Sequence, residues 1–241
     1  MEIIPVKIEK EIQFKDDLID LISNSVKILE GDILVVAQKI ISKQEGRMVD
    51  LSTVQPSLLA HGISSQYQKD PRIVELILSE SKKIIRMEHG VIIVETHNGF
   101  ICANAGIDES NVKDGFATLL PKNSDTSAKK LQNKIKEVLG KNVSIIISDT
   151  FGRPFRMGQT NCAIGISGIN PILDYTGTPD VFGNILRVTA IAIADELCSA
   201  AELVMEKTKK SPVAIIREYQ YSKGNKNIHD LIRPEQEDLF R

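Results

Sequence analysis

The segment from Gly152 to Gly183 is the feature that most constrains how this chain folds. It reads GRPFRMGQTNCAIGISGINPILDYTGTPDVFG, and its Gly, Pro, Asn and Asp residues recur too often for long helices or strands. Long ordered segments of this kind usually carry function, and the alternative is disorder. The apolar residues of 163–169 favour order. We therefore expect an ordered, functional segment shaped by turns rather than by long regular elements.

The rest of the chain alternates between strand-like and helix-like patterns. Apolar runs bounded by turn residues predict strands at 33–37, 91–95, 100–103, 143–148 and 213–217. Amphipathic spacing predicts helices beginning at Asp16-Asp17, at Pro71 and at Ser124-Asp125, the last running to Leu139. The Ala-rich range 187–207, free of Gly and Pro, predicts the longest helix. No strict βαβ repeat appears, and the tail 222–241 is polar and expected to pack loosely.

Charge and hydropathy exclude several classes of protein. Among 241 residues, 30 Lys and Arg face 32 Asp and Glu, which gives a formal charge of −2. This balance argues against nucleic acid and against a polybasic membrane arm. No apolar run approaches the roughly 20 residues of a membrane helix, and residues 1–10 are too charged for a secretory signal. We expect a cytoplasmic protein whose partners are small molecules or its own copies.

Cysteine and histidine patterns argue against zinc. Cys102, Cys162 and Cys198 are odd in number and far apart, with no C-x-x-C pair, so we expect buried free thiols. The four histidines are scattered as well. Any metal would therefore be a hard cation held by oxygen ligands, such as magnesium or manganese.

Two acidic clusters could supply those oxygens. Asp149 and Thr150 follow the apolar run 143–148, and Asp108 lies in the segment AGIDESN (105–111) after another strand-like run. If two strand ends meet, both carboxylates can share one magnesium or manganese ion with phosphate oxygens. The alternative is that each Asp merely forms a turn or caps a helix.

Basic residues nearby suit a polyphosphate. Lys39 and Lys43 are four apart and would share a helix face, while Arg153 and Arg156 flank Pro154. A solvated surface explains such basic residues more often, and it explains Asp195 and Glu202 of the long helix at least as well as a role in the site. No P-loop or Rossmann glycine motif occurs. From the residues alone, the prediction stops at an oxygen-ligand metal site beside basic groups.

Several long pieces of the sequence resemble the coenzyme F(420)-0:γ-glutamyl ligase family, in its stand-alone archaeal form. They are GDILVVAQKIISKQEGRMVDL (31–51), KDPRIVELILSES (69–81), ICANAGIDESNV (101–112), SDTFGRPFRMGQTNCAIGISGI (148–169), LDYTGTPDVFGN (173–184) and IADELCSAAELVMEK (193–207). They occur in the expected order between residues 31 and 217.

The resemblance implies a GTP-dependent ligase that joins L-glutamate to coenzyme F(420)-0 and then adds a second, γ-linked glutamate through an acyl phosphate, releasing GDP and phosphate. It implies two divalent cations (Mn²⁺ or Mg²⁺) and a monovalent K⁺. Asp108 and Asp149 would hold one divalent ion and Thr150 the second, with Arg153 also catalytic. The nucleotide would contact the residues Glu11, Ile12, Gln38, Lys39, Lys43, Asn111, Met205, Glu206, Lys207 and Thr208. The loop 152–159 would close over the deazaflavin or the acyl phosphate.

Departures from the family pattern affect expected nucleotide contacts but none of the expected metal ligands. The usual Gly-Leu-Pro-Glu-Ile turn matches only at Glu11-Ile12, and Gln38 stands where Ser is frequent. Glu206 and Glu218 stand where the family has Gly, a residue that often serves a positive φ. The loop near the phosphates is therefore expected to differ in shape.

The resulting expectation is an α+β fold with mixed or largely antiparallel sheets, homodimeric, forming a single domain over 1–241 or two lobes within it. Two other function classes stay open. One is a metal-dependent nucleotide phosphohydrolase, and the other is a non-catalytic nucleotide-binding module, which the acidic set of Asp108, Asp149 and Thr150 disfavours.

Overall fold

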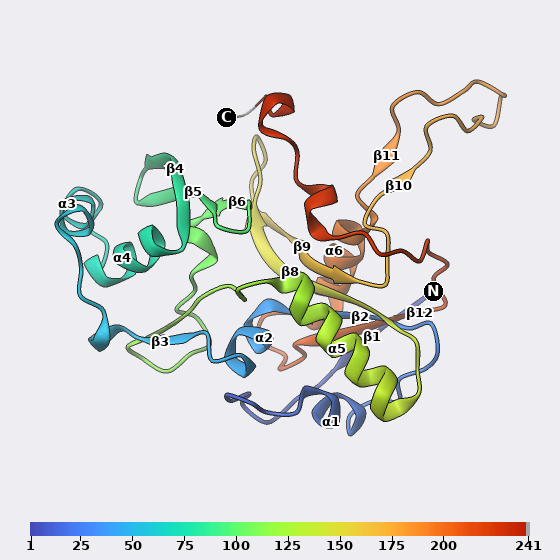
Figure 1. Cartoon of the computed structure of the whole chain (residues 1–241), viewed down its shortest axis with the longest axis horizontal. Coiled ribbons are helices and arrows are strands. Elements are labelled where there is room, and N and C mark those ends of the chain that lie inside the picture. The colour runs from blue at the N-terminus through green and yellow to red at the C-terminus, as the bar shows by residue number, and fades with distance from the viewer. Residues whose placement is uncertain (240–241) are drawn as a thin grey trace.

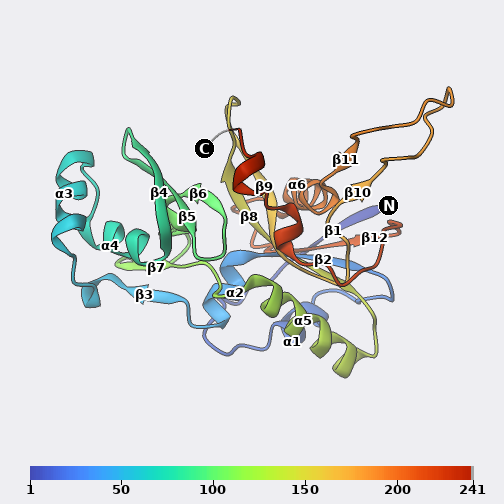
Figure 2. The same cartoon turned by 45° about the horizontal axis from the view of Figure 1, so that its top comes forward.

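The computed structural model describes residues 1–239, and its organising element is a five-stranded sheet (Figures 1 and 2). The strands are β1 (Glu2–Val6), β12 (Val213–Arg217), β2 (Ile33–Ala37), β8 (Ser144–Gly152) and β9 (Gln159–Ser167), in that order across the sheet. Only β2 and β8 pair in parallel, and the other neighbours are antiparallel. The mixed sheet of an α+β protein is thus confirmed.

Helices cover both faces of this sheet. Helix α6 (Ile193–Met205) packs on one face, and α5 (Ser124–Leu139) with α1 (Leu18–Ser23) lies on the other, as both views show (Figures 1 and 2). The strands between them are buried on both faces and read as unbroken apolar runs, Ile33–Val36 and Ile145–Ile147 among them. One hydrophobic cluster fills this part of the molecule.

A second hydrophobic cluster forms apart from the first, around the sheet β4-β5-β6. Its elements are α3 (Leu58–Tyr67), α4 (Pro71–Ser79), β4 (Ser81–Glu88), β5 (Val91–Thr96), β6 (Ile101–Ala103) and the pair β3 (Met48–Asp50) with β7 (Phe116–Thr118). The short helix α2 (Gln38–Gln44) follows β2 directly and leads from the large sheet towards β3. Helix α2 therefore connects the parts of the chain that form the two hydrophobic clusters.

The helix starts follow their capping residues. Asp17 accepts from the Ile19 amide at the start of α1, and α4 begins at Pro71, as the sequence predicts. The cap of α4 is Asp70, which accepts from the Arg72 amide. Helix α5 is capped by Asn123, which accepts from the Thr126 amide at 2.8 Å, and not by Ser124-Asp125 as expected. No helix in residues 1–239 is long and apolar enough to cross a membrane.

Two expectations about the Gly-rich half are wrong. Residues 159–167 form the nine-residue strand β9 instead of a turn-shaped loop. The predicted helix 187–207 begins only at Ile193, because Ala190–Ile191 form β11, which pairs with β10 (Leu173–Asp174). Residues 175–189 between these strands form a projecting hairpin, which we call the arm (Figures 1 and 2).

The polar tail is packed more firmly than its composition suggests. Ile228 is buried in the large cluster, and its amide donates to Asp125 Oδ2 at 3.1 Å. Lys83 of β4 pairs with Glu235 at 2.7 Å. The tail therefore contacts elements of both hydrophobic clusters, and only its last two positions, 240 and 241, lie outside the described residues.

Candidate functional site

A cleft of about 1310 Å³ opens where β2, β8 and α6 end. Its lining also includes the N-terminal segment 8–12, the start of α2 and the loop after β6. Arg153 and Arg156 lie outside this lining. The residues that the resemblance implies for the site, Arg153 apart, all lie in it: Glu11, Ile12, Gln38, Lys39, Lys43, Asp108, Asn111, Asp149, Thr150, Met205, Glu206, Lys207 and Thr208. Segments far apart in the sequence thus share one cavity.

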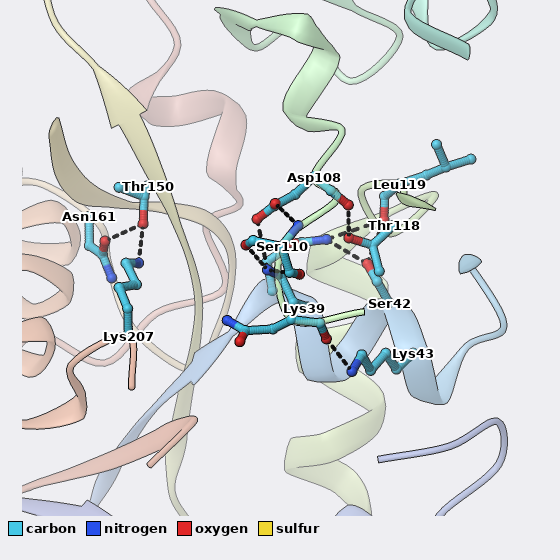
Figure 3. A network of polar contacts seen from close by, with 12 residues as sticks. Lys39, Ser42, Lys43, Asp108, Ser110, Thr118, Leu119, Thr150, Asn161 and Lys207 are labelled. Carbon is cyan, nitrogen blue, oxygen red and sulfur yellow. Dashed lines mark hydrogen bonds and ion pairs between the residues drawn. The ribbon is translucent and has the colours of Figure 1, made fainter. Parts of the chain in front are cut away.

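The two lysines of α2 fasten the loop that carries Asp108. Lys39 Nζ lies 2.7 Å from Asp108 Oδ2 and 2.8 Å from Ser110 Oγ, and Lys43 Nζ donates to the Asn111 carbonyl at 2.8 Å (Figure 3). Lys43 also pairs with Glu11 at 3.3 Å. Because the lysines are one helical turn apart, they reach the same side of α2, as their spacing predicts.

Burial and these contacts act in opposite directions on Asp108. Burial disfavours its charged form, but the hydrogen bonds from Lys39 and Ser110 outweigh this effect and hold the pKa of the carboxyl below its usual value. Asp108 is therefore ionised at neutral pH and keeps a cationic group beside it.

Asp149 has the opposite electrostatic character. Burial raises its pKa to about 6, and the charge of Asp108 adds to this shift against the lowering effects of the Thr150 amide and Lys207. Neighbouring protein groups therefore stabilise the ionised form of Asp149 too little to offset its burial. Added positive charge in the cleft would stabilise it.

Thr150 belongs to a second polar network on the α6 side of the cleft. Its Oγ1 donates to Asn161 Oδ1 at 2.7 Å and accepts from Lys207 Nζ at 2.5 Å (Figure 3). Asn161 Nδ2 donates in turn to Glu202 Oε2 at 3.0 Å, and Lys207 lies 3.5 Å from the other oxygen of Glu202.

Sequence reasoning did not identify Asn161, and it left Glu202 undecided. Asn161 stands in the Gly-rich segment, where Asn is typical of turns. Asn161 reaches Thr150 because the two residues pair directly across β8 and β9. The sequence predicted a loop in place of β9, so it could not predict this pairing.

A β-bulge shapes β9 beside the cleft. Ile147 pairs with Gly165 and Ser148 with Ala163, so Ile164 has no partner on β8. The Ala163 amide donates to Asp195 Oδ1 on α6 at 2.8 Å. Bulges of this kind bend a strand and redirect its side chains, and they recur next to active sites. Here the bulge places Asn161 towards α6, whereas the Cα of Gly165 faces Ser124 of α5.

The two glutamates at family glycine positions keep a glycine-like backbone. Glu206 ends α6 with φ 47° and ψ 150°, and Glu218 has φ 56°. A positive φ at a residue with a side chain carries an energetic cost. The expected difference in loop shape from the family stays a prediction.

Arg153 does not join the cleft. It lies in the tip of the β8–β9 hairpin, where its Nη2 donates to the Met157 carbonyl at 3.3 Å. Phe155 and Met157 of the same tip are exposed. The catalytic role expected of Arg153 stays a prediction.

The cysteines fit their expected role as free thiols. Cys102 and Cys198 are buried and Cys162 is half-buried. Burial raises the pKa of Cys102 to about 12, with a further contribution from Asp149, and raises the pKa of the other two thiols as well. Thiols of this kind are poor nucleophiles and poor metal ligands.

Comparison with known proteins gives one consistent family. The model of the F420-0:Gamma-glutamyl ligase family matches residues 7–218. A coenzyme F420:L-glutamate ligase of Methanothermobacter thermautotrophicus is 44% identical over 234 residues, 94% of this chain and 93% of that relative. One from Methanocaldococcus jannaschii is 47% identical over 215 residues, 89% and 86% of the two chains. One from Methanopyrus kandleri is 40% identical over 246 residues, 100% and 98%.

These matches span both hydrophobic clusters and all the segments that line the cleft. The chain therefore belongs to the F420-0:gamma-glutamyl ligase family.

Proposed function

We propose that the protein is a GTP-dependent ligase of coenzyme F(420) biosynthesis, which joins L-glutamate to F(420)-0 and then adds a second, γ-linked glutamate. The observation that carries the proposal is the cleft, whose lining includes the carboxylates of Asp108 and Asp149, the Thr150 hydroxyl and the ammonium groups of Lys39, Lys43 and Lys207. The ligase name of relatives that cover nearly the whole chain supports the glutamate and F420 substrates.

The oxygens of the cleft fit hard divalent cations. Asp108 and Thr150 each already contact a lysine ammonium, which marks where positive charge is favoured, and added positive charge would also stabilise the half-buried Asp149. We assign Asp108 and Asp149 to one Mn²⁺ or Mg²⁺ ion and Thr150 to a second, with K⁺ as a further ion. Within residues 1–239 no three His, Cys, Asp or Glu side chains form a metal-binding group, so water and phosphate oxygens would complete the coordination.

Bound there, the ions would neutralise the negative charge of the triphosphate and of its leaving group. Lys39, Lys43 and Lys207 would bind phosphate oxygens as point charges. To do so, Lys39 and Lys43 would exchange their present contacts with 108–111. Gln38, Asn111, the turn at Glu11-Ile12 and the segment 205–208 would then line the nucleotide.

The reaction proceeds in two steps, phosphorylation of a carboxylate and then formation of the amide. A carboxylate oxygen of the acceptor attacks the γ-phosphorus of GTP, the bond to the β-phosphate oxygen breaks, and GDP leaves. The glutamate amine then attacks the acyl carbon, phosphate leaves, and the amine loses a proton. Activation is needed because a free carboxylate is a poor electrophile. Catalysis then rests on positioning and charge neutralisation, which the cleft is suited to supply.

Product analysis tests the proposal. Incubation with GTP, Mn²⁺, F(420)-0 and glutamate should give a deazaflavin heavier by one or two glutamates, with one phosphate released for each. Phosphate release without a glutamylated product would instead identify a nucleotide phosphohydrolase. Nucleotide binding with neither product would identify a binding module.

Asp149→Asn tests the carboxylate assignment. The substitution keeps the size of the side chain but removes its charge, so metal-dependent turnover should be lost while the unfolding transition stays cooperative.

Arg153→Ala tests the hairpin tip. If the loop 152–159 closes over the substrate, this variant should lose turnover although Arg153 lies outside the cleft in this structure. Full activity would remove Arg153 from the catalytic set.

We also propose that the ligase acts in the cytoplasm as a homodimer and that its two hydrophobic clusters form two lobes flanking the cleft. The arm supports the dimer because Val181, Phe182 and Val188 are 94%, 88% and 90% exposed. Apolar side chains gathered on an ordered hairpin are typical of an interface.

A further inference from the structure

Asn161 is held more firmly than its position at the mouth of a hairpin requires. It is 6% exposed and pairs directly with Thr150 across the two strands. Helix α6 forms two hydrogen bonds with it: Ser199 Oγ donates to the Asn161 carbonyl at 2.9 Å, and Glu202 accepts from the Asn161 side chain. Backbone and side chain are thus both fixed by one helical turn of α6.

These contacts determine which way the Asn161 amide faces. A carboxylate only accepts hydrogen bonds, so the Asn161 NH₂ group must face Glu202, and the Asn161 oxygen must then face Thr150. That oxygen also only accepts. The one hydrogen of the Thr150 hydroxyl is therefore used by Asn161.

On its cleft side, the Thr150 hydroxyl therefore offers only its oxygen lone pairs, which accept hydrogen bonds or bind a cation. Lys207 Nζ, at 2.5 Å, already binds there as a donor (Figure 3). A serine or threonine hydroxyl without such a partner rotates freely and can donate as well as accept. In this site it is restricted to accepting.

We propose that Asn161, oriented by Glu202, is a positioning residue that makes Thr150 an obligate acceptor facing a cation in the cleft. The inference rests on the proposed function only in assigning a cation to Thr150. It extends the site to Asn161 and Glu202, which line the cleft beside Thr150. The competing explanation is that Asn161 only satisfies buried polar groups and leaves the hydroxyl unaffected.

A double-mutant cycle on Mn²⁺ affinity separates the two explanations. The free-ion electron paramagnetic resonance signal would give the Mn²⁺ dissociation constant in the presence of GTP for the wild type, Asn161→Leu, Thr150→Val and the double variant. Leu resembles Asn in shape but neither donates nor accepts. Asn161→Leu should weaken Mn²⁺ binding by roughly 10- to 100-fold, the range found for groups that orient metal ligands. The double variant should bind no more weakly than Thr150→Val alone, because Asn161 acts only through that hydroxyl.

Glu202→Gln is the second variant, for the case in which Asn161→Leu does not fold. A Gln side chain can donate as well as accept, so the Asn161 amide is no longer forced into one orientation. Mn²⁺ binding should weaken in the same direction but by a smaller factor. Asn142→Leu is the matched control, because it removes an Asn–Glu hydrogen bond of the same kind outside the cleft and should bind Mn²⁺ as the wild type does.

Three results would overturn the proposal: additive effects of Asn161→Leu and Thr150→Val, unchanged affinity in a folded Asn161 or Glu202 variant, or no Mn²⁺ binding by the wild type. The ligase function is judged separately from the deazaflavin product. A wild type that shows the non-additive cycle but makes no glutamylated product would retain the positioning role and reject the ligase.

Discussion

Strand β9 and the arm come from the same Gly-rich segment, yet they are built in opposite ways. Strand β9 packs against α5 and α6 with most of its residues buried, and it lines the cleft through Gln159 and Asn161. The arm leaves the body of the protein and exposes its largest apolar side chains. Both are ordered by hydrogen bonds, since in the arm Asp180 Oδ1 accepts from the Phe182 and Asn184 amides at 2.8 Å each.

The difference shows that glycine content does not by itself decide between strand and turn. In 159–167 the small residues permit close approach, and Gly165 lies directly against Ser124 of α5. In the arm, Gly177 and Gly183 supply positive φ of 84° and 86° for turns and have open space around them. Glycine serves packing in the first region and backbone direction in the second.

Gly165→Ala should lower the stability of the protein most, because it disturbs the close packing that distinguishes β9 from the arm. The added Cβ would lie 2.6 Å from the Ser124 carbonyl oxygen, and both partners are held in regular elements. Overpacking of this kind costs about 1–3 kcal/mol. The urea midpoint of unfolding should fall by a corresponding amount.

Gly152→Ala is the control for that substitution. It lies in the same hairpin, has no atom within 4 Å of an added Cβ, and should leave the urea midpoint nearly unchanged. Equal midpoints for the two variants would mean that β9 does not depend on close packing against α5.

This packing also explains how far the sequence could predict the molecule. The strand 33–37 and the run 143–148 were visible because they are continuous and apolar. Lys39 and Lys43 were placed correctly because helical spacing is local. Strand β9 was missed because its small residues have low strand propensity and become favourable only once α5 and α6 pack against them. Asn161 was missed with it.

Glu206→Gly should have the next largest effect, in the stabilising direction. A non-glycine residue at such a positive φ costs about 1–3 kcal/mol, of which the greater backbone entropy of Gly in the unfolded chain cancels roughly 0.5–1 kcal/mol. The free energy of unfolding should rise by about 1 kcal/mol. Glu206→Ala keeps a Cβ and should not show this gain, so an equal rise in both variants would trace the effect to the glutamate charge instead.

Asp195→Asn should show a smaller effect that depends on pH. Burial raises the pKa of Asp195 above its usual value, and the hydrogen bond from Ala163 offsets only part of that shift. The folded state therefore binds this proton more tightly than the unfolded state, and wild-type stability falls as pH rises from the unfolded pKa through the folded pKa. The Asn variant still accepts from Ala163 but has no charge to bury.

Asp195→Asn should consequently be the more stable protein at pH 7 and lose its advantage near pH 3.5. Urea midpoints of the two proteins across this range provide the measurement, and their difference removes the contribution of other carboxyls. A constant difference at all pH values would show that burial of the Asp195 charge does not strain the bulge.

Replacing Val181 and Phe182 together by Ser should change folding least, because both side chains lie at the exposed end of the arm. Surface substitutions usually alter stability by less than about 0.5 kcal/mol, so the urea midpoint measured on the dilute protein should stay within that limit. The substitution should instead weaken self-association.

If the arm forms the proposed dimer interface, sedimentation should show wild-type dimers and variant monomers at the same concentration. Leu203→Ser removes an apolar side chain of similar exposure from α6 and should leave the dimer intact. A variant arm that still dimerises would leave its exposed apolar residues without a role in self-association, and a monomeric wild type would do the same.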